Sequence, residues 1–145
     1  MINLNTGKQE FVLNFDGEHI EKIYFNPCDP ALMVRIKDFC DEAGRKISQL
    51  DDIELDEHGK PKDESFIGTF GKMLDIVYTG IDKAFGSEIS ATVFKYCSPF
   101  ARVSGGEYFF SAFVEAITPE IKHRVEKSTR EKAEKMKKHI GKYQK

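Results

Sequence analysis

The residues of this sequence that are best suited to chemistry are the carboxylates between positions 51 and 64, where seven acidic side chains gather. Asp52, Glu54 and Asp56 are spaced like the first three ligands of a calcium-binding loop. Such a loop needs a glycine directly after the third ligand to make a sharp turn, but Glu57 occupies that position. The segment is therefore expected to be a mobile, acidic connection that holds no specific metal ion.

The remaining polar residues form no catalytic pattern. The four histidines lack the HExxH spacing of a zinc protease, and no serine lies in a GxSxG turn. Gly105-Gly106 precedes a helical segment, where an anion could bind, but it lacks the GxGxxG spacing and the lysine of a P-loop. The three cysteines contain no CxxC pair, so neither a zinc site nor a disulfide framework is indicated. We therefore expect a protein that is not an enzyme and needs no cofactor.

Charge is distributed unevenly along the 145 residues. Residues 119–145 hold ten Lys and Arg against four Glu, a net charge of +6, which leaves −8 for residues 1–118. The N-terminus lacks the basic cluster and apolar run of a signal peptide, and no apolar stretch approaches the roughly 20 residues that span a bilayer. These features predict a cytoplasmic, single-domain protein with an acidic body, a basic tail and no membrane partner.

The N-terminal part of the chain predicts a small antiparallel sheet. Residues 9–15 and 19–25 alternate between apolar and polar side chains, and Asp16-Gly17 between them is a strong hairpin signal. Thr6-Gly7 could turn a further short strand, residues 2–4, onto this hairpin to give a three-stranded meander. Because two strands alone are marginal, the sheet must pack against helices.

The rest of the chain predicts four or five helices. Asp29 is suited to cap a helix that starts at Pro30 and ends near Leu50. Apolar spacing and capping residues, including Ser87 and the break Thr118-Pro119, place the other helices at 67–85, 87–97, 107–117 and 119–140. The fold class is thus α+β: a compact body over residues 1–118, with the sheet in 1–26 and helices in 29–118, and a basic helix over 119–145 that belongs to the same domain or projects as an arm.

The apolar stripes of these helices also predict the core. The side chains expected to be most buried are Phe39, Phe70, Leu74, Ile81, Phe110 and Phe113.

In size and in the order of its elements, the chain resembles the tail assembly chaperones of long-tailed phages that infect Gram-positive bacteria, and their prophage copies. The likeness covers most of the chain. The residues that carry it are Asn26-Pro27-Cys28-Asp29-Pro30, then Asp75, Tyr78, Ile81, Asp82, Phe85 and Gly86, then Phe113-Val114-Glu115-Ala116-Ile117-Thr118-Pro119, and Lys142-Tyr143 at the end of the basic helix.

This resemblance implies a non-enzymatic morphogenesis factor in the bacterial host cytoplasm that is absent from the finished virion. Such proteins keep the tail tube protein and the long, helical tape measure protein soluble until the tail polymerises. A homo-oligomer is also compatible with the sequence. The expected contact element is the last helix, through four candidate partner-binding residues: Val125, Lys132, Met136 and Ile140.

Two alternatives remain open. The basic helix could contact phosphates of nucleic acid, which would make the protein a nucleic-acid-binding accessory factor. Glutamates interleaved among its basic residues, and the lack of an aromatic residue for base stacking between Lys127 and Lys138, make this the less favoured interpretation. A small enzyme of unrecognised type would need a pocket with convergent polar groups, which no motif indicates. The basic segment is also compatible with a plain solvated helix.

Overall fold

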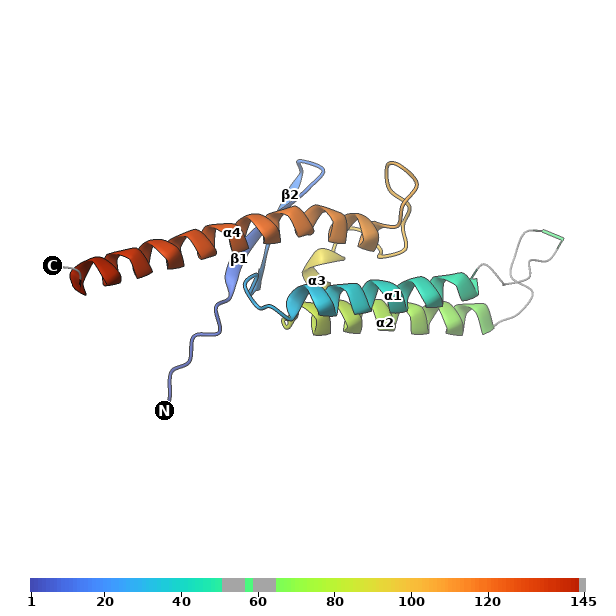
Figure 1. Ribbon diagram of the computed structural model, residues 1–145. Coiled ribbons are helices and arrows are strands. Elements are labelled where there is room, and N and C mark those ends of the chain that lie inside the picture. Colours follow the sequence, from blue (N-terminus) through green and yellow to red (C-terminus); the bar gives the residue numbers. More distant parts are fainter. Residues whose placement is uncertain (51–56, 59–64, 144–145) are drawn as a thin grey trace.

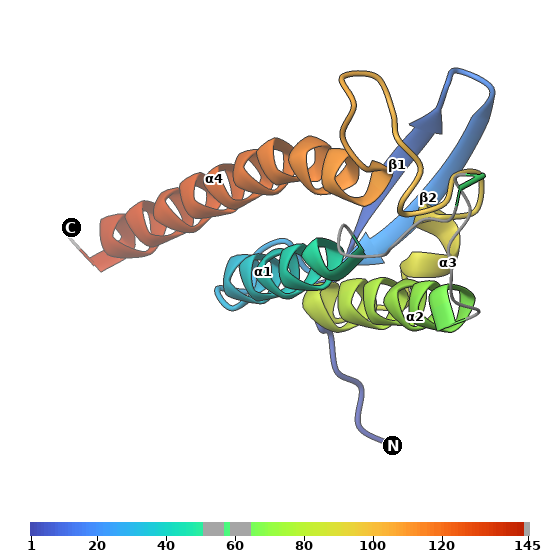
Figure 2. The same ribbon diagram turned by 90° about the vertical axis from the view of Figure 1, so that its right-hand side faces the viewer.

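A computed structural model describes residues 1–50, 57–58 and 65–143. Helices α1 and α2 lie side by side and antiparallel, and α4 runs above them (Figure 1). The hairpin extends from the α1–α2 pair past one side of α4 (Figure 2). The fold is α+β and mostly helical, as the sequence predicts. Its elements are β1 (Gln9–Phe15), β2 (His19–Phe25), α1 (Leu32–Leu50), α2 (Ser65–Phe85), α3 (Ser90–Val93) and α4 (Phe109–Tyr143).

The hairpin forms where the sequence predicts it. Asp16 and Gly17 both have positive φ values, 58° and 74°, as a type I′ turn requires, and the Glu18 N–H donates to the Phe15 carbonyl over 3.0 Å. The two strands pair antiparallel, with Phe11 opposite Ile23 on the buried face.

The predicted third strand at residues 2–4 is wrong, because the sheet has two strands and residues 1–8 form none. The chain before β1 is held differently from a hairpin turn. The Gly7 N–H donates to Asn5 Oδ1 over 2.8 Å, and Asn26 Nδ2 donates to the Thr6 carbonyl over 3.1 Å. These side-chain bonds direct residues 1–4 away from the sheet.

Helix α1 begins at Leu32, two residues after the predicted start at Pro30. Asp29 still caps it, since its Oδ1 accepts from the Ala31 N–H over 2.9 Å. Its other carboxylate oxygen accepts from Arg35 over 3.0 Å, and Arg35 Nε donates to the Ala84 carbonyl over 2.8 Å. The entry to α1 is therefore tied to the end of α2.

The predicted helix at residues 87–97 with Ser87 as its cap is wrong, because α3 spans only Ser90–Val93. Its cap is supplied by Asp82, from α2. The Asp82 carboxylate accepts hydrogen bonds from the Ile89 N–H at 2.8 Å, the Ser90 N–H at 2.7 Å and the Ser90 hydroxyl at 2.8 Å. A side chain eight residues earlier thus fixes where α3 begins.

The predicted break at Thr118-Pro119 is also wrong, because α4 continues through it with Pro119 in its interior. Pro119 has no N–H to offer the Glu115 carbonyl, but both residues are exposed, so water can bind that carbonyl. The Thr118 hydroxyl turns back onto the Val114 carbonyl over 2.7 Å instead of capping a new helix. The helices predicted at 107–117 and 119–140 are therefore one helix.

The core lies where the hairpin, α1, α2 and α4 meet. Among the predicted core residues, Phe39, Ile81, Phe110 and Phe113 are buried, whereas Phe70 and Leu74 are only partly buried. The most buried stripe of α2 instead contains Met73, Val77, Ile81, Ala84 and Phe85.

Aromatic contacts connect the elements of this core. Phe85 lies 4.9 Å from Phe25 of β2 and 5.8 Å from Phe113 of α4 between ring centres, and Phe39 of α1 lies 6.1 Å from Phe110.

Among the residues described, no helix combines the length and apolar character needed to cross a bilayer.

Candidate protein-binding surfaces

The first candidate surface is the outer half of α4, residues 125–143, which we name the distal arm. Every side chain from 126 to 141 is exposed, and the arm leaves the body as the continuation of α4 (Figures 1 and 2). The last buried residue of α4 is Ile121, at 2% exposure, and Arg124 is the next residue held against the hairpin. The arm therefore begins beyond Arg124 and not at Pro119.

The structure brings the four candidate partner-binding residues onto one side of this helix. At about 100° per residue, Val125, Lys132, Met136 and Ile140 fall within about 80° of one another around the axis. Val125 is 38% exposed, Met136 56% and Ile140 49%, and Lys132 is exposed between them. They form a thin apolar stripe with a lysine beside it, placed outside the core. Their role as partner contacts stays a prediction.

The rest of the distal arm is highly charged. Residues 126–143 contain seven Lys and Arg and three Glu. A helix that is polar on most sides and has no neighbouring element gains little from packing, because tertiary contacts supply most helical stability in proteins. Its apolar stripe is therefore available to another molecule.

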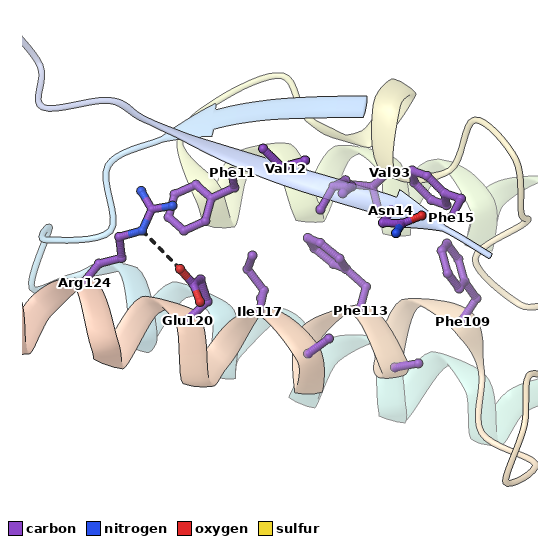
Figure 3. Close-up of a pocket in the computed structure, with 13 residues that line it drawn as sticks. Phe11, Val12, Asn14, Phe15, Val93, Phe109, Phe113, Ile117, Glu120 and Arg124 are labelled. Carbon is purple, nitrogen blue, oxygen red and sulfur yellow. Dashed lines mark hydrogen bonds and ion pairs between the residues drawn. The ribbon is translucent and has the colours of Figure 1, made fainter. Parts of the chain in front are cut away.

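The second candidate surface is an apolar groove between β1 and α4, with a volume of about 580 Å³. Phe113 and Ile117 rise from α4 toward β1, and Phe11 faces them from the strand (Figure 3). Ala112 and Ala116 also line the groove, and their short side chains leave the space open. No motif indicated this groove; the only signal available in the sequence was this pair of alanines, four residues apart on an otherwise bulky helix.

Arg124 closes one end of the groove. Its Nη1 donates to Gln9 Oε1 over 3.0 Å, its Nη2 donates to the Glu10 carbonyl over 2.9 Å, and its Nε pairs with Glu120 Oε1 over 3.2 Å. The guanidinium also lies over the Phe11 ring. One side chain thus links α4 to the strand edge by both hydrogen bonds and a cation–π contact.

The bond from Arg124 shows which backbone groups of β1 face the groove. In an antiparallel pair, the N–H and C=O of alternate residues point away from the partner strand. Since the Glu10 carbonyl points toward Arg124, Val12 and Asn14 also direct their backbone groups to this outer edge. Among the described residues, no backbone hydrogen bond reaches Val12 or Asn14 on this side. The groove therefore runs beside a free strand edge.

The predicted acidic connection, with Asp52, Glu54 and Asp56, lies outside the residues that the structure describes. Within the described ranges, no three His, Cys, Asp or Glu side chains are grouped to hold a metal ion.

The chain was compared with known protein families, curated proteins and solved structures. No protein-family model, no curated protein and no solved structure matches the chain.

Proposed function

We propose that this protein is a non-enzymatic assembly chaperone for phage or prophage tails. It binds the tape measure protein, the tail tube protein or both in the host cytoplasm and keeps them soluble until the tail polymerises, without entering the finished particle. The observation that carries the proposal is the distal arm, an exposed helix whose apolar stripe of Val125, Met136 and Ile140 has no partner within the described chain. The resemblance over most of the chain points in the same direction.

Physical chemistry explains how such an arm serves this purpose. A tape measure protein is long and helical, and its apolar stripes associate with one another when left uncovered. An exposed amphipathic helix covers such a stripe by helix-to-helix packing. The stripe on the distal arm is thin, so each contact contributes little and binding stays reversible, as release during polymerisation requires.

A co-expression experiment tests the proposal. The full chain is produced together with the tape measure or tail tube protein of the same phage or prophage, and the soluble fraction and pull-down of the tail protein are measured. Substituting Val125, Met136 and Ile140 together by Gln keeps the net charge and does not lower the helix propensity. We expect this variant to lose capture of the tail protein.

The matched control changes the opposite side of the same helix. Lys127→Gln with Glu134→Gln leaves the net charge unchanged and lies about 180° from Val125. We expect this control to retain capture. Equal capture by both variants would show that the stripe is not the contact surface.

The position of the arm also determines where to truncate the chain. A chain ending after Lys127 keeps Ile121 in the core and Arg124 on the hairpin, so the body is expected to stay folded. A chain that ends after Pro119 would lack both contacts, so a loss of binding could not be distinguished from a loss of folding. Recovery of nucleic acid instead of a tail protein, with retention that falls steeply as salt rises, would favour the nucleic-acid alternative.

A further inference from the structure

We propose that the first five residues of one copy of this chain bind, as an added strand, in the groove between β1 and α4 of a second copy. The two copies exchange these segments reciprocally and form a dimer. This inference does not rest on the proposed chaperone function, because it uses a different surface.

The N-terminal segment, residues 1–5, has the features of an unpaired strand. Ile2 is 85% exposed and Leu4 is 83% exposed, and they alternate with Asn3 and Asn5, so that one face is apolar and the other polar. The segment leaves the body without packing on it (Figure 1). The free energy falls when another surface covers apolar side chains that are this exposed.

The groove offers what such a strand requires. Val12 and Asn14 present free backbone groups on the outer edge of β1, and an added strand satisfies them. Phe113 and Ile117 line the same space from α4 and receive apolar side chains (Figure 3). Unprotected strand edges of this kind pair readily with another chain.

The charge and the length of the N-terminal segment also match those of the groove. Residues 1–7 contain no charged side chain in a chain that is 32% charged. The groove has one acid and one base, Glu120 and Arg124, which pair with each other and leave the rest of the lining uncharged. Residues 1–5, when extended, span about 13 Å from the first Cα to the last, and the five β1 residues that line the groove, Phe11 to Phe15, span the same length.

The segment is better placed to bind in the groove of a second copy than in the groove of its own chain. The segment leads directly into its own β1, and two bonds at its base, Gly7 to Asn5 and Asn26 to Thr6, direct it away from the sheet. Folding back would break both bonds, whereas reaching a second copy preserves them. Since the segment and the groove lie on the same chain, reciprocal exchange closes with two-fold symmetry and leaves no unfilled groove.

Amide hydrogen exchange on the full-length protein tests this directly, because strand addition protects the Val12 and Asn14 N–H groups. We expect their exchange to slow by roughly tenfold or more between about 10 µM and about 1 mM protein. Analytical ultracentrifugation over the same range should show conversion from monomer to dimer.

Two variants and a peptide complete the test. Ile2→Asn with Leu4→Asn should keep the protein monomeric with Val12 and Asn14 unprotected, whereas the control Asn3→Gln, on the polar face, should dimerise normally. A synthetic peptide of residues 1–7, added to the double variant, should restore the protection of both amides without restoring the dimer.

Three results would overturn the proposal. Protection of both amides in a monomer, at any concentration, would mean that the segment occupies its own groove. Protection that arises only after a tail protein is added would assign the groove to that partner. Exchange that stays fast at all concentrations, with the peptide present, would mean that no strand binds there.

Discussion

The guanidinium carbon of Arg124 lies 4.1 Å from the centre of the Phe11 ring, and this contact joins the middle of α4 to the first strand. The Arg124 side chain is 26% exposed and the Phe11 residue is 2% exposed. The aromatic face therefore meets the cation in a largely desolvated setting, where such contacts are strongest.

Arg124 should therefore contribute measurably to folding. We expect Arg124→Met to lower the free energy of unfolding by about 1–3 kcal/mol, because it loses the cation–π contact and the bonds to Gln9 and Glu10. Arg124→Lys keeps the charge but not the planar fork, so it should recover less than half of that loss. Urea denaturation measures both, and a lysine variant as stable as the native protein would contradict this role.

Gly80 should resist substitution, whereas Gly71 on the same helix should not. A Cβ at position 80 would lie 2.6 Å and 2.9 Å from two atoms of the buried Phe39 ring. We expect Gly80→Ala to destabilise the protein by about 1–3 kcal/mol, despite the better helix propensity of alanine. A Cβ at Gly71 meets nothing within 4 Å, so Gly71→Ala should stabilise it by about 0.5–1 kcal/mol. Thermal unfolding of the two variants should shift in opposite directions.

Asp82 should be the most sensitive polar residue of the body. Asp82→Ala leaves the buried Ser90 and two backbone N–H groups without their acceptor, at an expected cost of about 2–4 kcal/mol. Ser90→Ala removes only one of the three bonds and should cost about 1 kcal/mol. Chemical denaturation of both variants checks the order, and equal losses would mean that the backbone bonds contribute nothing.

Pro119 should reduce the stability of α4. Proline costs about 3 kcal/mol in a helix interior, but it also restricts the unfolded chain, so Pro119→Ala should raise stability by about 1–3 kcal/mol. Circular dichroism should show an equal or greater helical signal. Lys122→Ala, at an exposed position one turn later, serves as the control and should change stability by less than about 0.5 kcal/mol.

Stability should fall in acid partly because of Glu21. Its carboxylate accepts from Lys95 Nζ over 2.8 Å and from the Tyr96 hydroxyl over 2.7 Å, and these bonds, that from Lys95 first, lower the pKa of Glu21 below its usual 4.5. A lowered carboxyl pKa stabilises the folded state above pH 4.5, and this contribution is lost as the pH falls toward the folded-state pKa.

Variants at this pair test the assignment. The stability difference between the native protein and Glu21→Gln should be present at pH 7 and fade below pH 4.5. Lys95→Met should reduce this pH-dependent difference, because the bond from Lys95 is the largest cause of the lowered Glu21 pKa, whereas the bond from the Tyr96 hydroxyl remains. A difference that stays constant from pH 7 to acid would mean that the carboxylate charge plays no part.

Much of this fold could be predicted because its signals are local. The hairpin follows from alternation around Asp16-Gly17, the capping of α1 follows from Asp29, and the approximate extents of α1 and α2 follow from apolar spacing. The buried face of α2 was predicted only in part, because Met73 is buried where Phe70 and Leu74 were expected. The errors lie where a distant residue decides the outcome. Asp82 takes over the capping that Ser87 was expected to provide, and Asn26 holds Thr6 where a turn into a third strand was expected.

Of the two candidate surfaces, one could be predicted from the sequence and the other could not. The stripe of Val125, Met136 and Ile140 could be predicted, because helical spacing alone puts these side chains on one side. The groove could not, since its volume depends on how far Ala112 and Ala116 stand from β1 in the folded chain. Likewise, nothing local shows that Glu115 is exposed, which is what allows the helix to continue past Pro119.

The continuity of α4 has a mechanical consequence. Ile140 stands about 28 Å along the helix axis from the buried Ile121, at ~1.5 Å per residue, with no linker between them. A molecule bound near the tip is therefore held at a set distance and orientation from the body, as at the end of a lever. A force on a molecule bound at the tip is transmitted along α4 to the packing around Phe113 and Phe110. Release of that molecule therefore requires its contacts with the helix to break, because α4 has no hinge that could bend instead.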